Sequence, residues 1–227
     1  MKSPRKEREL GRLLVEGKKD VYAIAELMKR FGFDFDARPS GVPEIQPCDG
    51  CEGVLAALPV ALKTYSRVGV VMDADQSQDG RWQQLANLLA RHSISVPTHY
   101  AQDGIVCAGL KPEFILGIWI MPGNANTGYL EDFLGNLVAT TDATWDYAKD
   151  SCLEAKRLGA PFNDIHFSKA RLHTWLAWRE NPGSTFGVAF QQGWLRADAV
   201  LAKLFASWFV KVFPEGIEPQ PAESVTD

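Results

Sequence analysis

The sequence predicts an α/β fold: a mainly parallel sheet flanked by helices, followed by a C-terminal helical appendage. Up to about residue 138, short apolar runs alternate with segments whose apolar residues recur every three or four positions, the pattern of strand–helix units. The run 68–72 is apolar on both faces, as a central parallel strand is. Beyond residue 138 the strand signals stop and helical patterns continue.

Strands and helices of the first part follow from local patterns. Short apolar or β-branched runs, several bounded by Pro and Gly, predict strands at 12–15, 44–46, 68–72, 98–100, 105–107 and 114–121. Apolar residues at three- and four-residue spacing predict helices at 21–31, 54–65 and 82–89, and a fourth from about Thr127 to Leu137. Gly32 marks the end of the first helix.

The second part reads as helices at 145–158, 168–179 and 197–212. The last helix carries one apolar stripe: Leu201, Leu204, Phe205, Trp208, Phe209 and Val212. Such a stripe must be covered, either by the sheet of the same chain or by a partner. We therefore expect an α/β domain over 1–138, a helical appendage packed on it over 139–213, and a flexible acidic tail over 214–227.

Composition places the chain among globular proteins. Of its 227 residues, 46% are hydrophobic and 23% charged, and no apolar run is long enough to span a membrane. The charged segment 1–10 lacks the apolar core of a signal peptide, so we expect a cytoplasmic protein. The net charge of −4 comes from the tail, and no block is basic enough to indicate nucleic-acid binding by charge alone.

Acidic residues follow three of the predicted strands: Glu16 and Asp20, then Asp73 and Asp75, then Glu131 and Asp132. In an open parallel sheet, sites form at the carboxyl ends of the strands. Converging carboxylates repel one another, and Mg²⁺ or Mn²⁺ is the usual partner of an all-oxygen cluster. Two such ions would clamp the attacking and leaving oxygens of a phosphodiester.

Each of these acids also has an ordinary structural explanation. Glu16 can be a helix cap, and Asp20 can favour the first turn of a helix. Glu131 and Asp132 lie on an amphipathic helix, where exposed acids are routine. The D-x-D pair is harder to explain this way. Alternation along a strand would send Asp73 and Asp75 to the same side, where they repel.

Two segments, LLVEGKKD at 13–20 and VGVVMDADQS at 68–77, resemble a Toprim domain, the metal-binding module of primases, topoisomerases and OLD-type nucleases. The spacing of Glu16 and Asp20 is similar to the paired acids of the OLD-like branch. GIWIMPGNANTGYLEDFL resembles a third acidic motif of stand-alone bacterial Toprim proteins of unknown function, and HTWLAWRENPG, from His173 to Gly183, is similar to their C-terminal segment.

This resemblance implies a Toprim-like metal-binding domain over 1–138 and a nuclease that hydrolyses phosphodiester bonds with two Mg²⁺ or Mn²⁺ ions. Glu16, Asp73 and Asp75 would bind one ion, with Asp20 and Glu131 serving the second. Glu16 could assist as a general base.

OLD-type nucleases also use a lysine to stabilise the transition state, and Lys169 is the first candidate here, with Lys156 the second. His173 could contact phosphate, although a helix histidine without that role is more common. Trp175 and Trp178, three residues apart on one helix, are more typical of a core than of a base-stacking platform.

The resemblance also suggests a partner. OLD-like Toprim modules are often coupled to an ABC-type ATPase, and the chain has no P-loop of its own. We therefore expect an ATPase in trans or a homodimer, and by analogy alone a role in anti-phage defence.

Two other functional classes stay open. The D-x-D motif also occurs in haloacid-dehalogenase phosphatases, although there it follows the first strand. A non-catalytic Toprim-like subunit of a larger assembly is a further alternative. Cys48 and Cys51 form a single C-x-x-C without the second pair that a structural zinc site usually has.

Overall fold

A computed structural model describes residues 11–108, 114–123, 125 and 127–216. The sheet has five strands in the order β2-β1-β3-β5-β4, formed by β1 (Arg12–Val15), β2 (Glu44–Pro47), β3 (Arg67–Asp73), β4 (Ile105–Ala108) and β5 (Ile115–Met121). The pairs β1–β2, β1–β3 and β3–β5 are parallel, and only β4 runs antiparallel to its neighbour β5. The predicted α/β class with a mainly parallel sheet is therefore confirmed.

Eight α-helices and two short 3-10 helices lie within the described residues. The α-helices are α1 (Lys18–Lys29), α2 (Cys51–Thr64), α3 (Gln78–Arg91), α4 (Leu130–Gly135), α5 (Ala143–Arg157), α6 (Phe167–Ala177), α7 (Phe186–Gln191) and α8 (Val200–Val212). The 3-10 helices are η2 (Asp164–His166) and η3 (Pro214–Gly216).

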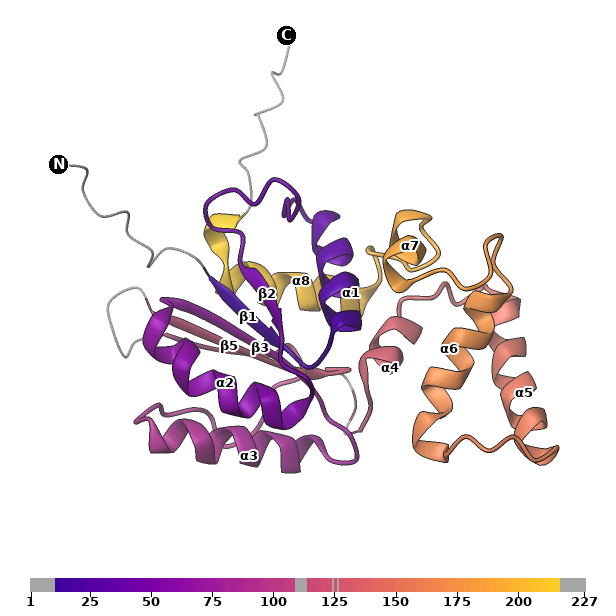
Figure 1. The fold of residues 1–227 in the computed structure, drawn as a ribbon, viewed down its shortest axis with the longest axis horizontal. Coiled ribbons are helices and arrows are strands. Elements are labelled where there is room, and N and C mark those ends of the chain that lie inside the picture. The colour runs from indigo at the N-terminus through magenta and orange to yellow at the C-terminus, as the bar shows by residue number, and fades with distance from the viewer. Residues whose placement is uncertain (1–10, 109–113, 124, 126, 217–227) are drawn as a thin grey trace, which may run out of the picture.

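Helices cover both faces of the sheet (Figure 1). Side chains of successive strand residues point to opposite faces, so β3 sends Val71 to one face and Val70 and Met72 to the other. The Val71 face packs with α1, α4 and α8, and the Val70 face packs with α2 and α3. Burial on both faces explains why the strands read as continuous apolar runs.

The aromatic stripe of α8 packs on the sheet of its own chain. Trp208, Phe209 and Val212 are fully buried, and α8 contacts β3, β4 and β5. The Trp208 indole donates to the carbonyl of Ile105 at 3.1 Å, which ties α8 to strand β4. Although it comes last in the sequence, α8 therefore belongs to the sheet layers, whereas α5 and α6 pack on each other and extend outward beside α4 (Figure 1).

Three expected elements differ in the structure: the strand at 98–100, the start of the fourth helix and the start of the last helix. Residues 98–100 form no strand. Their polar contacts are made elsewhere, since Thr98 accepts from the Trp82 indole and the Tyr100 hydroxyl accepts from the backbone of Ile120. The fourth helix begins at Leu130 instead of about Thr127, because Gly128 has φ +138° and pairs with Asp75.

Helix α7 was not predicted, since it has only six residues and contains a glycine. The last helix starts at Val200, three residues later than expected. Of the predicted acidic tail, 214–216 form η3, and 217–227 lie outside the described residues.

The α8 stripe generates a prediction about stability. Phe209→Ala should lower the free energy of unfolding by about 3–5 kcal/mol, because it opens a cavity in the core. Leu204→Ala on the same helix should cost less than about 1 kcal/mol, since Leu204 is 37% exposed. Urea denaturation of the two variants measures both values. Equal costs would contradict the packing of α8 on the sheet.

Candidate functional site: an acidic cluster at the carboxyl edge of the sheet

The three predicted acid-tipped strands are β1, β3 and β5, which are neighbours and parallel. Their carboxyl ends therefore meet at one edge of the sheet. Glu16 follows β1, Asp73 ends β3, and Glu131 follows β5 through the turn that leads into α4. We call Glu16, Asp20, Asp73, Asp75 and Glu131 the acidic cluster.

Glu16 and Asp73 are joined directly. The backbone N–H of Asp73 donates to Glu16 Oε1 at 2.9 Å, which links the ends of β1 and β3. Glu16 does not cap a helix, because the N-cap of α1 is Gly17. The Asp73 carboxylate has one oxygen, Oδ1, that is buried and has no hydrogen-bond partner among the described residues. A buried polar atom without a partner is rare and requires a physical explanation.

Asp75 lies beyond the end of β3, in a turn. Its φ of +54° is left-handed, and its backbone exchanges two hydrogen bonds with Gly128, at 3.1 and 3.0 Å. The expectation that strand alternation aligns it with Asp73 is therefore wrong. The turn nevertheless ties the D-x-D segment to the loop after β5.

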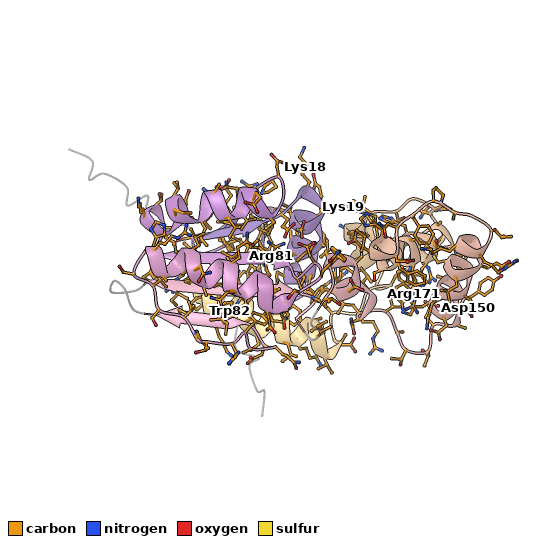
Figure 2. All side chains as sticks on the ribbon, turned by 90° about the horizontal axis from the view of Figure 1, so that it is seen from below. Lys18, Lys19, Arg81, Trp82, Asp150 and Arg171 are labelled. Atoms are coloured by element: carbon orange, nitrogen blue, oxygen red, sulfur yellow. The ribbon has the colours of Figure 1, made fainter. Side chains whose placement is uncertain are left out.

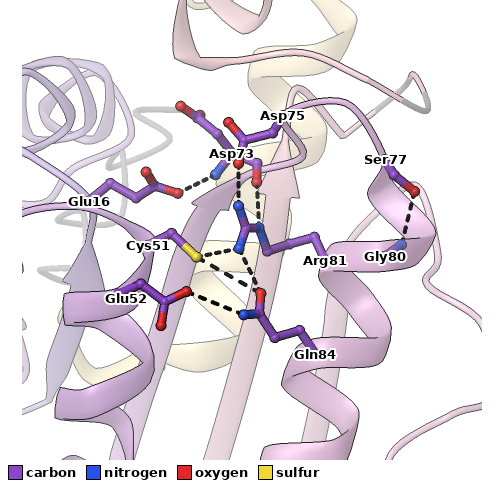
Figure 3. Close-up of polar contacts among 9 residues, drawn as sticks. All are labelled: Glu16, Cys51, Glu52, Asp73, Asp75, Ser77, Gly80, Arg81 and Gln84. Atoms are coloured by element: carbon purple, nitrogen blue, oxygen red, sulfur yellow. Dashed lines mark hydrogen bonds and ion pairs between the residues drawn. The ribbon is translucent and has the colours of Figure 1, made fainter.

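The Asp75 carboxylate is paired with Arg81 of α3 (Figure 3). The same guanidinium donates to the carbonyl of Asp73 at 3.0 Å and to Gln84 at 2.7 Å, and it contacts the Cys51 thiol. Arg81 thus anchors both acids of the D-x-D segment. Arg81 was not among the predicted site residues, and its only signal in the sequence was a base one turn into the helix that follows the motif.

Asp20 and Asp132 both cap helices. Asp20 Oδ2 accepts from Gly17 N–H at 2.9 Å, and Asp132 Oδ2 accepts from Tyr129 N–H at 2.9 Å. Asp132 also accepts from Ser168, so its two oxygens are occupied. Glu131, the preceding residue, is buried.

Burial and mutual repulsion dominate the electrostatics of the cluster. Burial raises the pKa of Asp73 well above its ordinary value, and the carboxylates of Glu16, Asp20, Glu131 and Asp75 raise it further. Burial raises the pKa of Asp20 to about 6, with contributions from Glu16 and Glu131. Burial also raises the pKa of Glu16. The other four carboxylates of the cluster therefore lie within electrostatic reach of Asp73.

A group of basic side chains borders the cluster. Lys169 Nζ lies 3.9 Å from Glu131 Oε1, and Lys19 Nζ lies 3.4 Å from His173 Nε2. Burial lowers the pKa of His173, and Lys19 lowers it further. Lys156 is elsewhere, paired with Asp164, so of the two lysine candidates only Lys169 lies beside the acids.

The tryptophans and cysteines have other surroundings. Trp175 is fully buried and donates to Asp142 at 3.0 Å, whereas Trp178 is 43% exposed and stacks on Tyr147. The Cys48 thiol donates to the carbonyl of Gln46. Neither thiol of the C-x-x-C pair is in a disulfide.

The donor set of the acidic cluster suits a hard divalent cation such as Mg²⁺ or Mn²⁺. Within the described part of the chain, no three His, Cys, Asp or Glu side chains already have a metal-binding arrangement, because Asp75 is held by Arg81 and Asp20 by Gly17. The free Asp73 Oδ1 and the repulsion among five carboxylates nevertheless fit a cation that is bound after modest side-chain rotation.

A comparison with family models matches residues 11–214 to the family described as "Protein of unknown function (DUF3226)". The chain belongs to this family. The match includes every residue of the acidic cluster and all eight α-helices, so the site and the fold lie within the family's common region. No curated protein and no solved structure matches the chain. Among the described helices, none has both the length and the apolar character to cross a bilayer.

The raised pKa of Asp20 predicts how stability depends on pH without metal. When the pKa of a carboxyl group rises from 3.8 to about 6 on folding, the protonated form of that group stabilises the folded state. This contribution to the free energy of unfolding is complete below pH 3.8 and is lost as the pH rises through about 6. Asp20→Asn keeps an oxygen for the Gly17 cap but cannot ionise. It should therefore match the wild type near pH 4 and exceed its stability at pH 7.5 by up to about 3 kcal/mol.

Thermal unfolding in EDTA across this pH range measures the difference. The matched control is Asp79→Asn, an exposed acid in the first turn of α3, which should show no such pH-dependent gain. A constant difference between wild type and Asp20→Asn at all pH values would contradict ionic repulsion as its cause.

Proposed function

We propose that the chain is a metal-dependent nuclease of Toprim type, which hydrolyses phosphodiester bonds of DNA or RNA. The observation that carries the proposal is the buried Asp73 Oδ1, which has no hydrogen-bond partner in the part of the chain that the structure describes and lies among four other carboxylates. The order of the acids along β1, β3 and β5 supports the resemblance of their motifs to Toprim domains.

Glu16, Asp73 and Asp75 would hold one Mg²⁺ or Mn²⁺ ion, and Asp20 and Glu131 would serve a second. Bound ions supply charge neutralisation for the phosphate and lower the pKa of water. Asp75 must first leave Arg81, its partner in the structure. Arg81 would still hold the backbone of Asp73 through its Nε hydrogen bond.

Two residues of the chain have further roles in this proposal. Glu16, oriented by the Asp73 N–H, would accept a proton from the attacking water. The half-exposed Lys169 ammonium beside Glu131 would donate to a phosphate oxygen as negative charge develops.

Location and partners complete the proposal. We place the protein in the cytoplasm, with an ABC-type ATPase in trans or a second copy of the chain as partner, and anti-phage defence as the process. The described cluster is acidic and few basic side chains border it, whereas tight nucleic-acid binding depends on phosphate neutralisation, so a partner would add further basic surface. Light scattering of the purified chain distinguishes a monomer from a dimer.

The central experiment is a cleavage assay with Mg²⁺ or Mn²⁺ on plasmid, single-stranded DNA and transfer RNA. Asp73→Asn should lower the rate at least about 100-fold, equivalent to about 2.7 kcal/mol, because it removes a metal ligand. Mn²⁺ should raise the melting temperature of the wild type but not of Asp73→Asn.

The control variant is Asp79→Asn, which should cleave like the wild type. No cleavage of any substrate, combined with a thermal shift by Mn²⁺ that needs Asp73, would favour the non-catalytic subunit. Turnover of a small phosphomonoester alone would favour the phosphatase.

The role of Lys169 gives a separate prediction. Lys169→Ala should lower the cleavage rate about 100-fold and leave the melting temperature within about 1 °C of the wild type, since the side chain is half exposed. Lys156→Ala is the matched control on the appendage and should retain full activity. Equal losses in both variants would reject a specific role of Lys169.

A further inference from the structure

A cavity lies beside the acidic cluster, between α1 and the segment that joins α6 to α7. It has a volume of about 370 Å³, within the usual range of small-molecule sites. Its walls are mostly apolar, and two exposed lysines lie at its rim. The residues that line it include Lys18, Lys19, Tyr22, His173, Leu176 and Phe186.

The cavity offers aromatic and apolar surface for a flat ring. Phe186 and Leu176 are buried and form its floor, and the His173 ring centre lies 5.6 Å from that of Phe186. Tyr22 also lines the cavity and is 63% exposed. An exposed aromatic ring next to an apolar cavity is suited to stacking on a nucleobase.

Two lysines and a histidine link the cavity to the acidic cluster. Lys19 Nζ lies 5.6 Å from the Phe186 ring centre and 3.4 Å from His173 Nε2. His173 is influenced electrostatically by both Lys169 and Glu131. The basic side chains of Lys19, His173 and Lys169 therefore form a path from the cavity to the acids. Figure 2 shows Lys18 and Lys19 where the sheet layers meet the appendage.

We propose that this cavity binds one nucleobase of a single-stranded nucleic acid, whose phosphates follow Lys19, His173 and Lys169 to the acidic cluster. The inference rests on the proposed nuclease function and names its substrate class as a single strand. In a duplex, a base is stacked and paired, and bringing it into a cavity costs unstacking energy. A free strand has no such cost. Lys18 at the entrance would pair with a neighbouring phosphate.

The test is binding of a fluorescent oligothymidylate, measured by anisotropy in EDTA and in Ca²⁺ over a range of salt concentrations. Tyr22→Ala should weaken binding about tenfold, the loss of one stacked base. Lys18→Gln should reduce the slope of log K against log salt by about 0.7, the value for one phosphate contact on a single strand. Both residues are exposed, and thermal melts verify that the variants fold.

Matched controls lie away from the cavity. Tyr147 on α5 is 64% exposed, and Lys63 on α2 is exposed on the opposite side of the sheet. Tyr147→Ala and Lys63→Gln should leave both affinity and salt slope unchanged. The same oligothymidylate annealed to oligoadenylate should bind more weakly than the single strand.

Several outcomes would overturn the proposal: no strand binding in either buffer, wild-type binding by Tyr22→Ala, or equal binding of the duplex. Self-association that is lost in Tyr22→Ala, with strand binding unchanged, would assign the cavity to a second copy of the chain. Tyr22-dependent binding without cleavage in Mn²⁺ would support the cavity and reject the nuclease. Cleavage that is unaffected by both variants would reject the cavity and leave the nuclease standing.

Discussion

Repulsion among the carboxylates at the carboxyl edge of β1, β3 and β5 is the constraint on which the rest of the site depends. Asp73 is surrounded by four other acids, and burial weakens the screening that water would provide. The fold relieves this cost only in part. Arg81 pairs with Asp75, Lys169 approaches Glu131, and the Asp73 N–H binds Glu16. Among the described residues, Asp73 Oδ1 has no hydrogen-bond partner.

Packing on both faces of the sheet holds the acids in place despite their repulsion. The strands β1, β3 and β5 are buried between α1 and α8 on one face and α2 and α3 on the other. The many buried apolar side chains on these two faces stabilise the folded state. Their contribution outweighs an electrostatic cost of about a few kcal/mol. Proteins often tolerate such a local loss of stability where a site serves a function. A ligand of opposite charge would recover part of that cost.

The sequence was most informative where topology determines position. Parallel strands bring their carboxyl ends together, so the convergence of Glu16, Asp73 and Glu131 could be predicted from three strand–acid junctions. Arg81 could not be predicted, since its role depends on the left-handed turn at Asp75 and on the orientation of α3.

The same limit applies to α8 and to the segment 98–100. The apolar stripe of α8 indicated a buried face but not which surface would cover it. Residues 98–100 have a strand-like composition, yet β5 already has β3 and β4 as its neighbouring strands, and Tyr100 contacts β5 only through its side-chain hydroxyl. Local pattern therefore predicted elements well and predicted their partners poorly.

The first turn of α1 joins the acidic cluster to the neighbouring cavity. Asp20 points to Gly17 and lies within reach of the acids, while Lys18, Lys19 and Tyr22 line the cavity. Because residues on a helix diverge by about 100° per position, one turn can present a carboxylate to one side and basic and aromatic groups to the other. The rigid link means that a strand seated in the cavity would have a fixed position relative to the acids, which is the condition for cutting at a defined phosphate.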